Sequence, residues 1–158
     1  MLYFKIMKIR IENLRDGSNH WEETVAPDEL ELDTNSFKEM VKVELDIEKR
    51  SGKITISISV SSNGSYICDR CGEEFSKKIS DKYLVVFIKR ESPLPEEAPG
   101  DDLRSYQPGQ RELDITTDVR DAMLLTMPLK MLCKDDCKGL CSKCGANLNY
   151  DECICKTG

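Results

Sequence analysis

Alternation of apolar and polar residues is the clearest structural signal in the sequence, and it lies between residues 41 and 60. Every second residue is apolar from Val41 to Ile47, and again from Ile54 to Val60. The short segment that joins these two runs contains Ser51-Gly52. Two runs of period two joined by a glycine-containing link predict an antiparallel β-hairpin with one buried and one solvated face.

Weaker runs of the same kind predict further strands around this hairpin. Residues 2–11, 20–25, 75–79 and 83–88 each contain apolar residues at strand spacing. Asn63-Gly64 is a dipeptide typical of tight turns, and it predicts a turn directly after the hairpin. The expected fold class is therefore α+β, mainly antiparallel β, arranged as a meander or a partly closed barrel.

One helix and one long loop are expected after the strands. Residues 91–110 contain four of the six prolines and an excess of acidic residues, which predicts a mobile loop. Helical spacing of Val119, Ala122, Met123 and Thr126 predicts a helix over residues 116–127, which Pro128 ends. We expect a β-rich domain over residues 1–128, with Met7 as a candidate start of the chain.

Composition restricts the class of protein. The chain has 158 residues, of which 39% are hydrophobic, and a net charge of −6. This length suits one core, and the negative charge means that any contact with nucleic acid needs a local basic surface. The sequence shows no secretory signal and no long apolar span, so a cytoplasmic location is expected.

Cysteine departs most from an ordinary composition. Two cysteines lie in the middle of the chain and six near its end: Cys68, Cys71, Cys133, Cys137, Cys141, Cys144, Cys153 and Cys155. In a reducing compartment, clustered cysteines bind metal more often than they form disulfides. The single histidine, His20, is far away in the sequence, so the sequence predicts metal sites made of cysteine alone.

The spacing of the cysteines favours two structural zinc ions. Residues 68–72 and 141–145 both read Cys-x2-Cys-Gly, which is typical of a zinc-binding turn. The favoured partition groups Cys141, Cys144, Cys153 and Cys155, and leaves Cys68, Cys71, Cys133 and Cys137 as the second set. The exchange of one ligand between the sets, and a single site with free cysteines elsewhere, are the alternatives. Residues 129–158 are poor in apolar residues, and we expect them to be a zinc-binding tail packed on the β-rich domain.

Other uses of the cysteines have less support. Disulfides need an oxidising compartment that nothing in the sequence indicates. The spacing of Cys137, Cys141 and Cys144 matches that of radical enzymes with an iron–sulfur cluster, but the chain lacks their length and strand–helix alternation. No phosphate-binding or nucleophile motif is present, and His20 is expected to be a surface residue of a strand. A zinc ion with four thiolate ligands has no open coordination position for water. The sequence therefore predicts a protein that is not an enzyme.

A family resemblance lies in the segment Tyr66 to Cys71, in Leu113-Asp114-Ile115, in Met127 to Lys130 and above all in Cys133 to Asn149. With these motifs the chain resembles the YceD family, the large ribosomal RNA subunit accumulation proteins of bacterial type. The resemblance implies a non-enzymatic role in the accumulation, processing or assembly of large-subunit ribosomal RNA. It also implies that ribosomal RNA, or a protein of the pre-ribosomal particle, is the partner.

A contact surface for such a partner has only weak support from the residues. Arg70, Lys77, Lys78 and Lys82 give residues 70–90 a positive balance, but an exposed sheet face carries similar charges in many proteins. We expect neither a membrane nor a small-molecule substrate as partner. The rival hypothesis is a thiol-based redox or metal-handling protein that uses the C-terminal cysteines.

Overall fold

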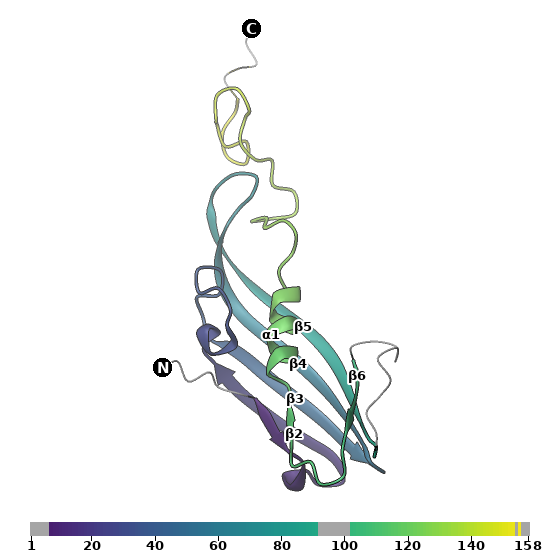
Figure 1. The fold of residues 1–158 in the computed structure, drawn as a ribbon. Helices are drawn as coiled ribbons and strands as arrows, with labels where there is room; N and C mark the ends of the chain where they lie inside the picture. Colours follow the sequence, from purple (N-terminus) through teal and green to yellow (C-terminus); the bar gives the residue numbers. More distant parts are fainter. Residues whose placement is uncertain (1–6, 92–101, 154, 156–158) are drawn as a thin grey trace.

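The computed structural model describes residues 7–91, 102–153 and 155. Its elements are β1 (Lys8–Arg10), η1 (Ile11–Asn13), β2 (Gly17–Val25), η2 (Pro27–Leu30), β3 (Val41–Arg50), β4 (Lys53–Ile67), β5 (Glu74–Lys89), β6 (Leu103–Tyr106), β7 (Glu112–Asp114) and α1 (Thr116–Leu125). Five strands form one sheet in the order β2-β3-β4-β5-β6, and β1 pairs with β7. The molecule is elongated, with α1 across one face of the sheet and the cysteine-rich segment beyond one end (Figure 1).

The predicted hairpin is confirmed. Strands β3 and β4 pair antiparallel from Arg50 opposite Lys53 to Lys42 opposite Ser61. Ser51 and Gly52 form the turn with φ angles of +48° and +77°, as a two-residue turn that matches the twist of the strands requires. The apolar positions of both strands therefore share the buried face.

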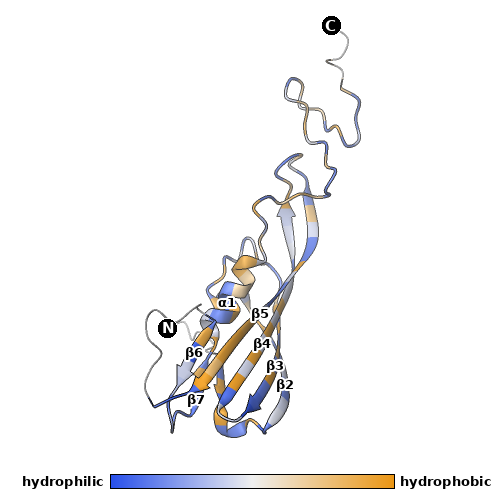
Figure 2. Ribbon diagram, turned by 90° about the vertical axis from the view of Figure 1, so that its right-hand side faces the viewer, coloured by the Kyte–Doolittle hydropathy of each residue, from blue (hydrophilic) through white to orange (hydrophobic). Residues whose placement is uncertain are grey.

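The core lies between this face of the sheet and helix α1. Ile54, Ile56 and Ile58 are fully buried on β4, and Val119 and Met123 of α1 are fully buried as well. Figure 2 shows the helix against the apolar face, with hydrophobic residues concentrated along the central strands. The sheet is open, since β2 and β6 are its two edges, so the meander is formed and the partly closed barrel is not.

The prediction of a turn at Asn63-Gly64 is wrong. Both residues lie inside β4, opposite Lys78 and Lys77 of β5. Gly64 is needed there for space. A Cβ atom on Gly64 would collide with the ring and hydroxyl of Tyr66, two residues further along the same face. The glycine thus makes room for an aromatic ring within a strand instead of allowing a turn.

Strands β4 and β5 are longer than predicted. The expected strands over 75–79 and 83–88 are parts of one continuous strand, β5, which pairs with β4 over the whole length of β4. The pairing of β4 with β3 stops at Ser61, opposite Lys42 near the start of β3, so residues 62–67 of β4 and 74–79 of β5 continue as a two-stranded arm. We call residues 62–79 the β4–β5 arm, and it leads toward the cysteine-rich end of the molecule (Figure 1).

The prediction of a mobile loop over residues 91–110 is wrong for residues 103–106. Leu103–Tyr106 forms β6, which pairs parallel with β5, and residues 92–101 lie outside the described residues. A non-local ion pair fixes β6, since Arg104 donates two hydrogen bonds to Asp118 of α1, at 2.8 and 2.5 Å. Composition alone does not reveal a partner 14 residues further along the chain.

The described residues show part of the expected N-terminal strand, which stops at Arg10 because Ile11 begins η1, and they show a helix shorter than expected. Residues 1–6 lie outside the described residues, and β1 covers only Lys8–Arg10. Helix α1 ends at Leu125, two residues before the predicted end. In the described part of the chain no helix combines the length and the apolarity that crossing a lipid bilayer requires.

Candidate metal centres

Four thiols meet at the tip of the β4–β5 arm. We call Cys68, Cys71, Cys133 and Cys137 the inner cysteine site; their sulfur atoms all lie within 4.8 Å of one another. The Sγ–Sγ distance is 3.7 Å for the pair Cys68 and Cys137 and 3.7 Å for the pair Cys71 and Cys133. A zinc tetrahedron with bonds of about 2.3 Å has edges of about 3.8 Å. The donor set therefore fits a tetrahedral ion such as zinc.

A second group of four thiols lies further from the sheet. We call Cys141, Cys144, Cys153 and Cys155 the outer cysteine site; these sulfurs also lie within 4.8 Å of one another. Cys153 Sγ is 3.2 Å from that of Cys141 and 3.8 Å from that of Cys144. This set also has the ligand type and count of a structural zinc site.

The grouping of the sulfurs is the partition favoured by the sequence. The sulfurs form two sets of four, and no cysteine is exchanged between the sets. All eight cysteines belong to the described residues, and each is a free thiol, so none forms a disulfide. Two groups of four cysteines in this chain can therefore each hold a metal ion.

Both Cys-x2-Cys-Gly segments adopt the same local geometry. Gly72 N–H donates to the Cys68 carbonyl at 2.9 Å, and Gly145 N–H donates to the Cys141 carbonyl at 2.9 Å. The two glycines have φ angles of +72° and +74°, a region in which a side chain is strained. The repeated turn directs two thiols of each site to the same side.

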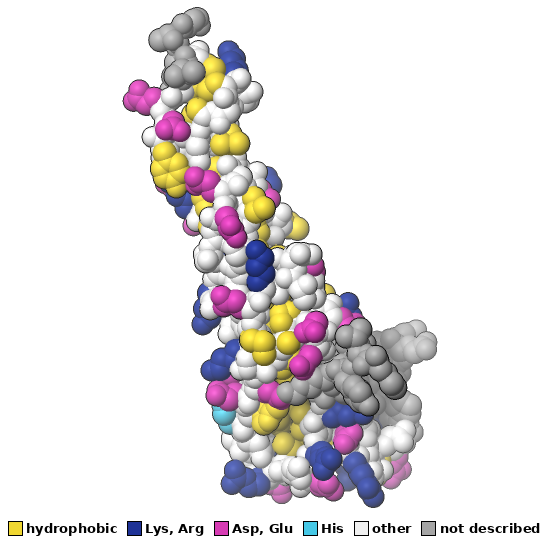
Figure 3. All heavy atoms as spheres, turned by 90° about the vertical axis from the view of Figure 1, so that its left-hand side faces the viewer, with side chains coloured by type: hydrophobic (Ala, Val, Ile, Leu, Met, Phe, Trp, Pro, Cys, Tyr) yellow, Lys and Arg dark blue, Asp and Glu magenta, His cyan; other side chains and the backbone are white. Residues whose placement is uncertain are grey.

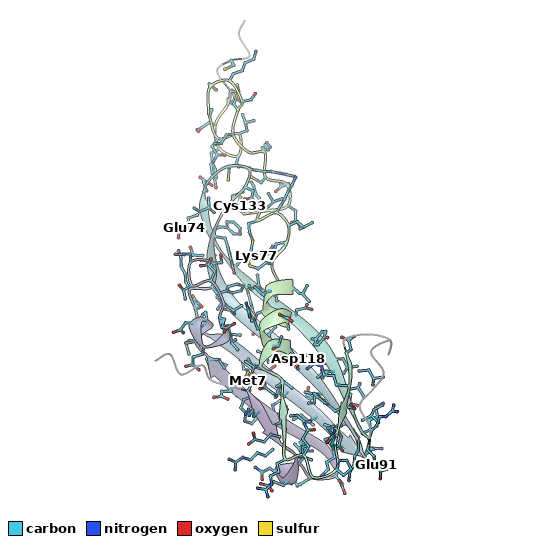
Figure 4. All side chains as sticks on the ribbon, viewed as in Figure 1. Met7, Glu74, Lys77, Glu91, Asp118 and Cys133 are labelled. Atoms are coloured by element: carbon cyan, nitrogen blue, oxygen red, sulfur yellow. The ribbon has the colours of Figure 1, made fainter. Side chains whose placement is uncertain are left out.

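The chain before Cys133 is tied to the first of these turns. Asp69 N–H donates to the Met131 carbonyl at 2.8 Å, and Met131 N–H donates to the Asp69 carboxylate at 2.6 Å. This reciprocal pair brings Cys133 to the end of the molecule where β5 begins, near Glu74 (Figure 4). The inner cysteine site thus links the sheet to the segment that follows α1.

The thiols of each site differ in acidity. Desolvation acts to raise the pKa of Cys68, but backbone N–H groups, the strongest from Cys133, lower it to about 6. Desolvation and neighbouring thiols raise the pKa of Cys133 to about 12. In the outer site, the N–H of Cys144 lowers the pKa of Cys141 to about 6, whereas the hydrogen bond to Cys144 raises that of Cys155 to about 12. A divalent cation that replaces the retained protons favours four thiolates in each site.

The two sites differ in exposure. Cys68, Cys71 and Cys137 are buried, and Phe75 and Leu132 pack against them. In the outer site Cys144 is exposed, and the other three cysteines are only partly buried. Solvent and competing chelators therefore reach the outer site more easily than the inner one.

The four basic residues singled out in the sequence do not form one surface. Lys78 and Lys82 are exposed on the outward face of β5, while Lys77 belongs to the opposite face, opposite Gly64. Arg70 lies at the inner cysteine site, where its Nη1 donates to the Cys137 carbonyl at 2.9 Å. On the face seen in Figure 3, acidic and basic side chains are interspersed along the molecule.

His20 is placed far from both cysteine sites, on β2. Its Nδ1 lies 2.8 Å from a carboxylate oxygen of Asp46 on the neighbouring strand β3, and both side chains are exposed. The hydrogen bond with Asp46 raises the pKa of His20 above its ordinary value. This is the surface pair expected of a strand residue.

Sequence reasoning missed the residues that surround the sulfurs. Asn149 donates from Nδ2 to Cys137 Sγ at 3.3 Å, and this hydrogen bond lowers the pKa of Cys137. Tyr150 donates from its hydroxyl to Glu73 at 3.2 Å. Asn149 ends the segment that carries the family resemblance, but its spacing from the cysteines gives no sign of a contact with the inner site.

Comparison with known proteins identifies relatives of this chain. The family described as large ribosomal RNA subunit accumulation protein YceD matches residues 56–158, which include both cysteine sites. A protein of Arabidopsis thaliana named large ribosomal RNA subunit accumulation protein YCED homolog 1, chloroplastic, is 27% identical over 139 residues, or 73% of this chain and 43% of the relative. Its namesake in Zea mays is 27% identical over 144 residues, or 73% of this chain and 48% of the relative.

The chain thus spans less than half the length of these two curated relatives. No solved structure matches it. The family match covers about two thirds of the sequence, from β4 through the last cysteine. On this basis the chain belongs to the YceD family.

Proposed function

We propose that this chain is a non-enzymatic factor that supports the accumulation of large-subunit ribosomal RNA, during its processing or assembly. The observation that carries the proposal is the YceD family match over residues 56–158. Two curated relatives bear the same function in their names. The matched region contains both cysteine sites, so we expect the metal-bound segment to belong to the functional part of the molecule.

We propose that zinc is the ion in both cysteine sites and that its role is structural. Four thiolates are the ligands of structural zinc, and they leave no open position for water or substrate. The short loops around the outer site contain few buried apolar residues, so a bound ion is the main source of their order. This closed coordination also supports a function other than catalysis.

We propose that the partner is either the ribosomal RNA itself or a protein of the pre-ribosomal particle. Lys78 and Lys82 lie on one face of the sheet together with the hydroxyl groups of Ser59, Ser61 and Ser80. This combination suits phosphate oxygens, which accept hydrogen bonds from lysine and serine. We also propose a cytoplasmic location, because a reducing compartment keeps the eight thiols available for metal.

Depletion of the protein in its own cells tests the proposal. We expect large-subunit ribosomal RNA to fall relative to small-subunit RNA, and the wild-type chain to restore it. A Cys68→Ser, Cys71→Ser variant should fail to restore it, whereas Ser57→Ala on the outward face of β4 serves as the matched control. An unchanged ratio of the two RNAs after depletion would refute the function.

Metal analysis separates this proposal from a thiol-based redox or metal-handling role. Protein purified in air should contain two zinc ions per chain, and its thiols should react slowly with a maleimide. Substoichiometric metal together with rapidly reacting thiols would favour the redox role instead.

A further inference from the structure

Asn149 connects the two cysteine sites. It lies in the loop between Cys144 and Cys153, both of which belong to the outer cysteine site. Its amide nitrogen nevertheless donates to Cys137 Sγ in the inner site, at 3.3 Å. The loop that the outer site closes therefore supplies a hydrogen-bond donor to a ligand of the inner site.

The side chain of Asn149 is oriented by its surroundings. Its Oδ1 accepts a hydrogen bond from Lys138 N–H at 2.9 Å, and its Nδ2 also donates to Asn147 Oδ1 at 2.8 Å. An amide held through both its oxygen and its nitrogen has one orientation available. That orientation directs Nδ2 toward the sulfur of Cys137.

The position of the loop depends on the segment between the two sites. Leu140 forms a β-bridge with Asn147, and Leu148 N–H donates to the Gly139 carbonyl at 2.9 Å. Cys141 N–H donates to the Ala146 carbonyl at 2.8 Å, within the turn that carries two ligands of the outer site. Asn149 thus reaches Cys137 only while the turn and loop of the outer site are folded.

Two further contacts hold the loop against the inner site. Tyr150 donates to Glu73, the residue whose carbonyl accepts the N–H of Cys68. Leu140 N–H donates to the Arg70 carbonyl at 3.2 Å. Gly139 lies against the same carbonyl, with φ of +75°, and a Cβ there would come within 3.0 Å of the Arg70 oxygen.

We propose that Asn149 couples the two cysteine sites, so that a metal ion in the outer site strengthens metal binding at the inner site. The proposal rests on the metal binding included in the proposed function. A hydrogen bond to a ligand sulfur stabilises the thiolate that holds the ion, and loss of such a bond typically weakens metal binding about 10- to 100-fold. Because coupling between sites is reciprocal, the inner ion strengthens the outer site by the same factor.

Titration of the metal-free full chain with zinc, followed by native mass spectrometry, measures this coupling. The spectra give the amounts of chains with no, one and two ions. The measured ratio is the square of the one-ion population divided by the product of the zero-ion and two-ion populations. This ratio falls as the coupling between the sites grows. In Asn149→Ala we expect this ratio to rise on the order of tenfold.

Three variants distinguish coupling from a general loss of structure. Tyr150→Phe removes the hydrogen bond to Glu73 but keeps the amide on Cys137, so the ratio should change less than in Asn149→Ala. Asn35→Ala removes an asparagine whose side chain bonds only to Asp33 among the contacts described, and it should leave the ratio unchanged. In a Cys141→Ser, Cys144→Ser background the outer site is lost, and Asn149→Ala should then have no effect on zinc affinity at the inner site.

An unchanged ratio in Asn149→Ala would overturn the coupling. An equal loss of inner-site affinity with and without the outer site would overturn it as well, since Asn149 would then act on the inner site alone. Failure to bind zinc at all would instead refute the metal in the proposed function. The ribosomal RNA measurement after depletion is independent of all three outcomes.

Discussion

Arg104 and Asp118 join the edge of the sheet to the helix through two hydrogen bonds, at 2.8 and 2.5 Å. The carboxylate of Asp118 is almost completely buried, whereas the guanidinium remains partly exposed beside Phe87. Strand β6 is only four residues long and has a sheet partner on one side, β5. The ion pair is therefore a main attachment of β6 to the rest of the molecule.

Removal of the arginine should cost substantial stability. Arg104→Ala leaves a buried carboxylate without its cation, and we expect a loss of about 3 kcal/mol in the free energy of unfolding. Urea denaturation followed by circular dichroism measures this loss. Arg50→Ala is the control, because the pair of Arg50 and Glu48 is exposed on both sides and should be worth less than about 1 kcal/mol. Equal effects of the two substitutions would contradict the prediction.

Gly64 and Tyr66 should respond to substitution in opposite ways. Gly64→Ala places a methyl group against the ring of Tyr66 and should destabilise the protein by about 1–3 kcal/mol. The Tyr66 hydroxyl is buried without a hydrogen-bond partner among the described residues. Tyr66→Phe should therefore leave the thermal midpoint unchanged or raise it, since no hydrogen bond is lost. A marked fall in the midpoint of Tyr66→Phe would show that the hydroxyl has a partner.

Removal of metal should unfold one end of the molecule and spare the other. With a strong chelator, we expect the amides of Gly145 and Leu148 to lose protection against hydrogen exchange. The amides of Val43 and Ile56, in the paired strands β3 and β4, should keep theirs. Hydrogen exchange measured by mass spectrometry resolves the two regions. Retained protection in residues 139–150 without metal would contradict a structural role of the ion.

The pair of His20 and Asp46 should make the free energy of unfolding depend on pH, with a sign that follows from the raised pKa of His20. The hydrogen bond with Asp46 raises the pKa of His20, so the folded state favours the protonated ring. The stabilisation from the pair is present below the ordinary pKa of histidine, near 6.5, and is lost as the pH rises through the raised value. Proton NMR measures this pKa without ambiguity, because the chain has one histidine. Asp46→Asn should lower the pKa toward its ordinary value, and an unchanged pKa would contradict the assignment.

Local patterns predicted the parts of the fold that depend on local chemistry. The hairpin of β3 and β4 follows from alternation and from Ser51-Gly52. The grouping of the eight cysteines follows from chelate spacing, because two residues between thiols suit one ion. Helix α1 follows from the spacing of Val119, Ala122 and Met123.

The wrong or missing predictions involve contacts between residues distant in the sequence, or a nearby side chain that gives a turn-type dipeptide a different role. Asn63-Gly64 has the sequence of a turn, but the glycine is there because the ring of Tyr66 leaves no room for a side chain. Strand β6 lies in a proline-rich, acidic stretch, and it depends on Asp118 in the helix. The amide of Asn149 meets Cys137 only after the loop of the outer site has folded back. No pattern along the sequence records such contacts.

Strand β4, which continues from the sheet into the β4–β5 arm, sets the length of the molecule. Strand β4 has 15 residues and so extends for about 50 Å at 3.3 Å per residue. The hydrophobic core lies along the part of β4 that pairs with β3, residues 53–61. The cysteine sites begin at Cys68, directly after the end of β4. A single partner that touches both His20 on β2 and the outer cysteine site must therefore be large, on the scale of a macromolecular assembly.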